Sequence, residues 1–188
     1  MARWDPGAEE RLKRAAVELY LEHGYDNVTV TQIAERAGLT RRSYFRYFPD
    51  KREVLFAGSE RLPPALAEAV LTADPNAAPL AAVLDALARV GAELVEHVDG
   101  ATERRAVIDA SPELQERERT KTAAITAAIR DALKQRQVNA GTAELVAQLA
   151  TVAFQNAFRH WIEADGRASF GSCLHTVIDE LRAALAGT

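Results

Sequence analysis

A chain of 188 residues has room for one large domain or two small ones, and a globular chain of this length buries roughly 70% of its unfolded surface. Its content of 48% hydrophobic and 27% charged residues is ordinary for globular proteins. The sequence has only 10 Gly and 7 Pro, and this low content excludes a low-complexity protein. The single cysteine, Cys173, excludes an internal disulfide. The sequence contains no run of about 18 apolar residues, so no membrane span is predicted. We therefore expect a soluble, cytoplasmic protein.

The net charge of −4 hides an uneven distribution of charge along the chain. Between residues 39 and 52 a single anion, Asp50, stands against five cations, so this segment carries +4 and the rest of the chain −8. The cations are Arg41, Arg42, Arg46, Lys51 and Arg52. A small basic element on an acidic body predicts a protein that touches a polyanion with one edge, because phosphate attraction acts within a Debye length of about 8 Å.

Capping residues followed by Gly or Pro predict four helices at the start of the chain. They cover residues 5–24, 29–38, 40–48 and 50–63, with Asp5–Pro6 opening the first and Pro63–Pro64 ending or kinking the fourth. The second and third are joined across Gly38-Leu39-Thr40, which is the spacing of a helix-turn-helix. The third helix is then the one presented to a DNA major groove.

A helical wheel of the third helix separates aromatic from basic side chains. The inward set is Tyr44, Phe45 and Phe48, the outward set is Arg42, Ser43, Arg46 and Tyr47, and Arg41 lies at the edge of the inner sector. Arg41 is long enough to reach outward from the first turn.

Residues 29–51, TVTQIAERAGLTRRSYFRYFPDK, closely resemble the DNA-binding signature of the TetR family, and the first helix extends the resemblance to about residue 55. The family usually has tyrosine where this chain has Phe45, and that hydroxyl often meets DNA. The resemblance therefore does not carry a phosphate contact over to Phe45, and contact of its ring with a thymine methyl stays open. The resemblance implies an all-α fold of about nine helices. It also implies a helix-turn-helix domain over 1–55 and a helical domain over 56–188 for effector binding and dimerisation.

The resemblance also distributes roles among the basic segment's residues. Arg41 and Arg42 are expected to read bases, with Ser43 and Arg46 as further candidates. Thr29, Thr40, Tyr47 and Lys51 are expected to hold phosphates, with amide donors added by the start of the fourth helix. Tyr44 and Phe45 complete the candidate DNA-binding set. The alternative is a solvated basic face on which the two threonines merely cap helices.

Beyond Pro64 the sequence is rich in alanine and leucine, and turn signals predict five more helices. They cover residues 78–98, 102–110, 112–137, 142–164 and 170–186. In the TetR family the last two helices of each subunit pair with those of a second copy. Apolar stripes suited to such a homodimer, or to an internal core, are Leu145, Val146, Leu149, Val152, Ala153, Asn156 and Ala157, with Leu174, Val177, Ile178, Leu181 and Leu185.

The family also implies a cavity for an apolar small-molecule effector, whose binding would release the operator DNA from a repressor. Candidates to line it, or to serve as plain packing, are Leu87, Val90, Leu94, Val107, Ile108, Ile125, Ile129, Phe154, Phe158 and Trp161. The operator, the regulated genes, the effector and the choice between repressor and activator are not encoded in these patterns.

Two other classes of function are alternatives to a DNA-binding regulator. A protein-interaction module could keep the fold and use the basic helices to bind an acidic protein. A helical enzyme would need converging acids, bases or nucleophiles, which the sequence does not offer. His23, His97, His160 and His175 form no i, i+4 pair, so we expect no metal site, no cofactor and no catalysis.

Overall fold

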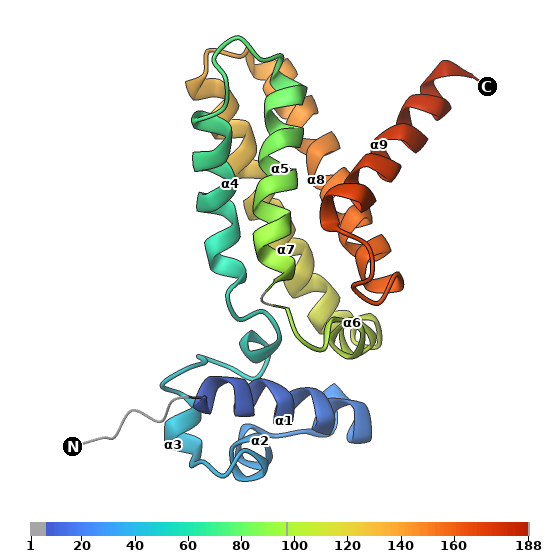
Figure 1. Cartoon of the computed structure of the whole chain (residues 1–188). Coiled ribbons are helices and arrows are strands. Elements are labelled where there is room, and N and C mark those ends of the chain that lie inside the picture. The colour runs from blue at the N-terminus through green and yellow to red at the C-terminus, as the bar shows by residue number, and fades with distance from the viewer. Residues whose placement is uncertain (1–6, 97, 188) are drawn as a thin grey trace. The chain divides into compact units, whose positions relative to one another are not determined.

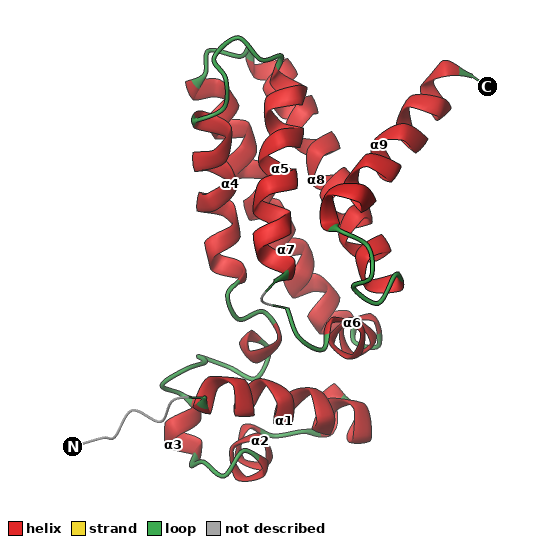
Figure 2. Cartoon of the chain, in the orientation of Figure 1, coloured by secondary structure: helices red, strands yellow, loops and turns green. Residues whose placement is uncertain are grey.

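The computed structural model describes residues 7–96 and 98–187, and within these ranges every regular element is helical (Figures 1 and 2). The α-helices are α1 (Ala8–His23), α2 (Val30–Arg36), α3 (Arg41–Tyr44), α4 (Leu62–Leu71), α5 (Pro79–Val95), α6 (Ala101–Asp109), α7 (Pro112–Gln135), α8 (Ala140–Glu163) and α9 (Phe170–Ala186). The predicted all-α class and number of helices are confirmed. In these two ranges no helix is long and apolar enough to cross a membrane.

α8 begins at Ala140, two residues before the expected start at Thr142, and α9 begins at Phe170 as expected; both helices have a side-chain N-cap. The Asn139 side chain accepts a hydrogen bond from the Thr142 amide at the start of α8, and the Ser169 hydroxyl accepts one from the Ser172 amide at the start of α9. α5 ends at Val95, three residues earlier than expected. The predicted first start at Asp5–Pro6 and one histidine, His97, lie outside the described residues.

The prediction of one helix over residues 50–63 is wrong. Two 3₁₀ turns, Glu53–Leu55 and Ser59–Arg61, occupy this segment, and the next α-helix, α4, starts at Leu62. Pro63 and Pro64 therefore lie in the first turn of a helix rather than at its end. Proline is tolerated there because the first amides of a helix have no intrahelical partner to lose.

The chain forms two compact units. The first unit contains the residues through Gly58 together with Gly100–Glu118, and the second contains Ser59–Asp99 and the residues from Arg119 onward. The division expected after residue 55 did not place α6 and the start of α7 with the N-terminal helices. As a division between DNA-binding and effector-binding functions it stays a prediction.

The first unit is built around tyrosines as well as aliphatic side chains. Tyr20, Tyr25 and Tyr44 are all buried in its core. The Tyr20 hydroxyl donates to the Lys51 carbonyl at 2.6 Å, and the Tyr44 hydroxyl donates to the Asp50 carbonyl at 3.0 Å. Burial raises the pKa of Tyr20 and of Tyr44 well above the ordinary value, so both hydroxyls stay protonated donors. These bonds fix the loop that follows α3.

The second unit has a core made largely of alanine, leucine and valine from α4, α5, α7, α8 and α9. Its closest approach is at Gly91 in α5, where an added Cβ atom would overlap the ring of Phe170 in α9. Phe170 is itself fully buried and packs against Phe154 with ring centroids 5.3 Å apart. Glycine is therefore needed at position 91 for close helix packing rather than for a turn.

Candidate nucleic-acid interface

α2 and α3 form a helix-turn-helix whose ends are held by threonine caps. Thr29 and Gln32 form a reciprocal capping box: the Thr29 hydroxyl accepts from the Gln32 amide at 3.3 Å, and the Gln32 side chain accepts from the Thr29 amide at 2.8 Å. Thr40 caps α3 by accepting from the Ser43 amide at 3.1 Å. Gly38 sits in the turn between them with φ +71, a conformation that favours glycine.

α3, the second helix of this motif, is called the recognition helix below. It and the turns that follow it are anchored by two buried aromatic side chains. Tyr44 and Phe48 are almost fully excluded from solvent, and their rings lie 5.5 Å apart in the first unit's core. Regular α-helix ends at Tyr44, and the chain continues to Phe48 through shorter turns such as Arg46 N–H to the Ser43 carbonyl. The predicted helix over 40–48 is therefore shorter in its α-helical part.

The outward face of this segment is basic, as the wheel predicted. Arg41, Arg42 and Arg46 are exposed, and Ser43 and Tyr47 are partly exposed. Among the described residues the side chains of Arg42 and Arg46 make no intramolecular hydrogen bond or ion pair, so their guanidinium groups are available to an external partner. A guanidinium offers five donors in a fixed plane, which suits a guanine edge or a phosphate.

The expectation that Phe45 faces the core is wrong. Its side chain is 46% exposed, because Tyr44 and Phe48 fill the inward positions and Phe45 lies at the edge of that sector. The Arg41 guanidinium lies 5.5 Å from the centre of the Phe45 ring. The Phe45 ring also meets the Tyr44 ring edge-on, with centroids 5.7 Å apart. An apolar ring is thus displayed among the arginines.

Lys51 is engaged within the protein. Its ammonium donates to the Tyr25 carbonyl at 3.0 Å and to the Val28 carbonyl at 3.4 Å, and it lies 4.0 Å from the centre of the Tyr25 ring. These contacts hold the segment between α1 and α2. Thr29 and Thr40 are exposed as well as capping, so their hydroxyls lie on the surface. The phosphate-binding roles of these three residues stay predictions.

The amide donors expected at the start of a fourth helix are not arranged in that way. No α-helix begins at Asp50; instead its carboxylate accepts from the amides of Arg52 at 2.8 Å and Glu53 at 3.2 Å. The Arg52 guanidinium pairs with the same carboxylate at 2.7 Å and holds the pKa of Asp50 below its usual value. This turn is neutralised internally rather than left open for a phosphate.

Long-range polar contacts tie the start of α7 to the segments that flank the helix-turn-helix. Glu113 accepts from the Tyr25 hydroxyl at 3.0 Å and lies 3.6 Å from the Arg52 guanidinium. Arg117 donates to the Glu53 carboxylate at 2.6 Å. The sequence gives no signal for these pairs, because their members lie far apart in the chain and have no periodic relation.

A match to a known family covers most of the N-terminal segment of this unit. Residues 12–57 match the model of "Bacterial regulatory proteins, tetR family". This region is therefore similar to the DNA-binding region of the tetR family. The predicted resemblance over the helix-turn-helix is confirmed, and the matched range runs from the first buried leucine of α1 to the end of the anchoring turn after Glu53–Leu55.

The chain is also similar to curated HTH-type transcriptional regulators. The HTH-type transcriptional regulator TcmR of Streptomyces glaucescens is 36% identical over 96 residues, which are 49% of this chain and 42% of TcmR. The uncharacterized HTH-type transcriptional regulator YdeS of Bacillus subtilis is 34% identical over 64 residues, 31% of this chain and 32% of YdeS. The chain thus spans less than half the length of these relatives. Both are described as transcriptional regulators and not as enzymes.

The likeness of fold to solved structures extends beyond the helix-turn-helix. The structure of SmeT in complex with triclosan superposes with a TM-score of 0.59 at 17% identity, covering 93% of this chain and 91% of SmeT; SmeT is the repressor of a Stenotrophomonas maltophilia multidrug efflux pump. At this identity the likeness shows the fold, including the helical C-terminal part.

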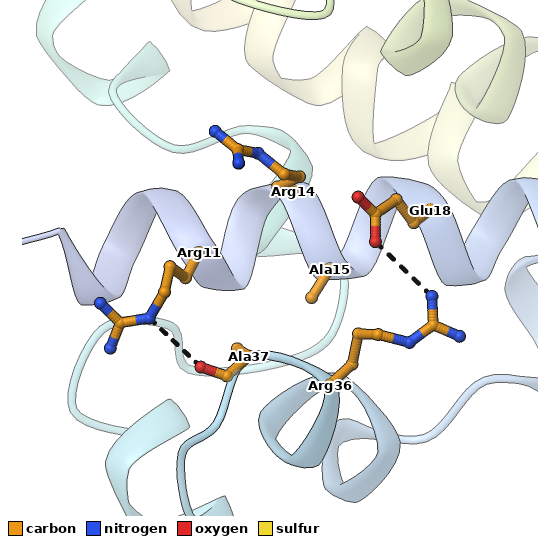
Figure 3. A pocket seen from close by; sticks show the side chains of 6 residues that line it. All are labelled: Arg11, Arg14, Ala15, Glu18, Arg36 and Ala37. Carbon is orange, nitrogen blue, oxygen red and sulfur yellow. Dashed lines mark hydrogen bonds and ion pairs between the residues drawn. The ribbon is translucent and has the colours of Figure 1, made fainter.

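The first unit also contains a shallow cavity of about 190 Å³ between α1 and α2 (Figure 3). Its lining is Arg11, Arg14, Ala15, Glu18, Arg36 and Ala37. Arg36 is held by the carboxylates of Glu22 at 2.8 Å and Glu18 at 3.5 Å, and the Arg11 side chain donates to the Ala37 carbonyl at 3.2 Å. The charges of this notch thus help to fasten α1 to α2.

The predicted effector-lining residues fall into two groups. Leu87, Ile129 and Phe154 are buried in the core of the second unit, and Val90, Leu94, Ile125, Phe158 and Trp161 pack against that core. Val107 and Ile108 belong instead to the core of the first unit. The structure therefore does not bring all ten together, and their role as ligand contacts stays a prediction.

Proposed function

We propose that this protein is a transcriptional repressor that binds a palindromic operator as a homodimer and is released by an apolar small-molecule effector. The observation that carries the proposal is the set of exposed arginines on α3, held in place by a buried aromatic anchor. Such a helix can enter a major groove, where guanidinium groups bond guanine O6 and N7. A regulator of this kind acts on the chromosome, which places it in the cytoplasm.

The proposed roles in DNA binding differ according to whether each side chain is already engaged within the protein. Arg42 and Arg46 carry the readout of bases, together with Arg41. Thr29 and Thr40 position the helices on phosphates through hydroxyls at the exposed helix starts. Lys51 acts mainly by ordering the segment between α1 and α2. A phosphate contact of Lys51 is secondary to this role.

The homodimer is supported by an apolar stripe on α8. Leu145, Leu149 and Val152 are 58%, 37% and 55% exposed, and their spacing of four and three residues places them on one face. Val146, Ala153 and Ala157, from the same predicted stripe, are buried in the second unit's core. The sequence pattern therefore contains two faces, and the exposed one is available to a second copy.

The proposed effector is an apolar molecule bound in the second unit. Support comes from the aliphatic core and from Phe158 and Trp161, whose rings stack with centroids 5.6 Å apart. SmeT, which shares the fold, has been seen with triclosan. Such a ligand would release DNA only by preferring a dimer in which the two recognition helices no longer match successive major grooves.

The first test is selection of the purified protein on random duplex DNA, after refolding from denaturant to remove any bound small molecule. We expect a palindrome whose half-sites are about one helical turn apart, or somewhat more. Arg42→Ala should lose discrimination at one base position by about 5- to 150-fold. Arg167→Ala, which removes an exposed cation from the turn after α8, is the matched control. A refolded dimer that enriches no sequence would refute the proposal.

The second test concerns the dimer. Leu149→Arg should convert the protein to a monomer in sedimentation experiments and weaken binding to the two-half-site operator at least tenfold. The control is Leu71→Arg, because Leu71 is a comparably exposed leucine on α4, outside the stripe. A dimer that survives the Leu149 change with unaltered affinity would place the interface elsewhere.

A further inference from the structure

Arg41 and Phe45 form a pair on the exposed face of the recognition segment. They are four residues apart, the guanidinium lies 5.5 Å from the ring centre, and both side chains are exposed. The edge-on contact with Tyr44, which is fully buried, supports the ring from below. The two groups therefore present themselves to an external partner together.

The spacing of this pair limits what it can touch on DNA. Base pairs are stacked at about 3.4 Å, so two groups 5.5 Å apart in direct contact with each other meet the same or adjacent base pairs. The stack also restrains the guanidinium, because a cation over an aromatic face loses fewer orientations when it binds. Readout by Arg41 and Phe45 is thus coupled rather than independent.

The chemistry of each member identifies the bases. A guanidinium is the preferred partner of guanine O6 and N7, and an apolar ring suits the C5-methyl group of thymine. Phenylalanine has no hydroxyl to bond a phosphate or a base edge. In a right-handed duplex the C5 group of a pyrimidine lies beside the O6 and N7 edge of the guanine on its 3′ side, where it would meet both side chains.

We propose that Arg41 and Phe45 together read one dinucleotide step in each half-site, a thymine immediately 5′ of a guanine. Arg41 bonds the guanine, and the thymine methyl packs into the angle between the guanidinium and the Phe45 ring. This inference rests on the proposed function and specifies the sequence that the recognition helix prefers.

The decisive experiment deletes the methyl group alone. In the selected operator, deoxyuridine replaces the thymine of the TG step, and binding is measured by titration. For the wild-type protein we expect about a 4- to 10-fold loss of affinity, the scale of one buried methyl group. Deoxyuridine at a thymine outside the step should have no effect. Replacing the thymine by 5-methylcytosine, paired with guanine, should restore affinity, whereas unmethylated cytosine should not.

Protein variants assign the effect to the pair. Phe45→Ala should bind thymine and deoxyuridine operators equally, while Phe45→Tyr keeps the ring and should remain sensitive to the methyl group. Arg41→Ala should lose preference for the guanine and most of the methyl sensitivity. Because Phe45 is exposed, these variants should melt within a few degrees of wild type, which thermal unfolding checks.

The outcomes separate this inference from the proposed function. An operator that is bound tightly but contains no TG step, or a Phe45→Ala variant as sensitive to deoxyuridine as wild type, overturns the paired readout and leaves the regulator intact. Failure to bind any duplex overturns both.

Discussion

The cores of the two units are stabilised by different kinds of interaction. The core of the first unit contains three tyrosines, two of them donating to main-chain carbonyls of the loop after α3. The core of the second unit contains no tyrosine among its buried residues and is dominated by alanine and other aliphatic side chains at helix contacts. Hydroxyl bonds specify loop positions one by one, whereas small side chains specify how closely helices approach.

This difference matches what each unit is proposed to do. A recognition helix must be held in one position relative to α1 and α2, and directional hydrogen bonds from buried groups provide such positioning. A core of aliphatic side chains contains no side-chain hydrogen bonds that an apolar ligand would have to break. Three substitutions test the contrast.

The largest effect should come from Tyr44→Ala. It removes a fully buried ring and its bond to the Asp50 carbonyl, so the free energy of unfolding should fall by about 3–5 kcal/mol. Equilibrium urea unfolding measures this loss. Tyr44→Phe keeps the ring and should cost only about 0.5–1.5 kcal/mol. If Tyr44→Ala lowered the free energy of unfolding by less than about 0.5 kcal/mol, the ring would not be the anchor of α3.

An intermediate effect is expected from Gly91→Ala in the second unit. The new methyl group overlaps the Phe170 ring, which is buried and has no free space, so we expect about 1–3 kcal/mol of destabilisation from overpacking. Gly171→Ala is the matched control, because no atom lies within 4 Å of an added Cβ there and the residue is also helical. Thermal melts of the two variants should differ in sign or clearly in size; coincident melts would contradict the close packing.

The smallest effect concerns the pH dependence of stability at Asp50. Because Arg52 and two amides favour its charged form, the pKa is lower in the folded protein, and the stabilisation is present at neutral pH. It should be lost as the pH falls through the folded-state pKa, below about 3.9. The side chain is partly exposed, so we expect about 1 kcal/mol at most.

Asp50→Asn isolates that contribution. The variant should be less stable than wild type at pH 7, and the difference should shrink as the pH is lowered toward 2.5. The measurement is the free energy of unfolding in urea at several pH values. A difference that stays constant across this range would mean that the carboxylate charge does not stabilise the turn.

Much of the helical framework was predictable because it depends on local signals. α7, α8 and α9 follow the turn signals Ser111-Pro112, Asn139-Ala140-Gly141 and Asp165-Gly166, which are local features of the sequence. The fourth predicted helix failed because Pro63–Pro64 suits the start of a helix as well as its end, and periodicity alone does not distinguish the two.

The recognition surface was predictable only in part. The outward arginines follow from helical periodicity, but Phe45 lies at the edge of the inner sector, where the competition with Tyr44 and Phe48 for buried space decides its position. Contacts such as Glu113 with Tyr25 join residues remote in the chain, so no local pattern contains them. The lining of an effector site depends on the same kind of long-range packing.

The composition of the first unit has a consequence for synthesis. Val107, Ile108 and Leu114 complete the core that α1, α2 and Tyr44 begin, and they lie about 50 residues or more beyond the helix-turn-helix in the chain. A nascent chain that has emerged only through Gly58 still exposes the apolar surface that these residues cover. The unit that carries the recognition helix therefore completes its folding only after the Ser59–Asp99 segment of the second unit has left the ribosome.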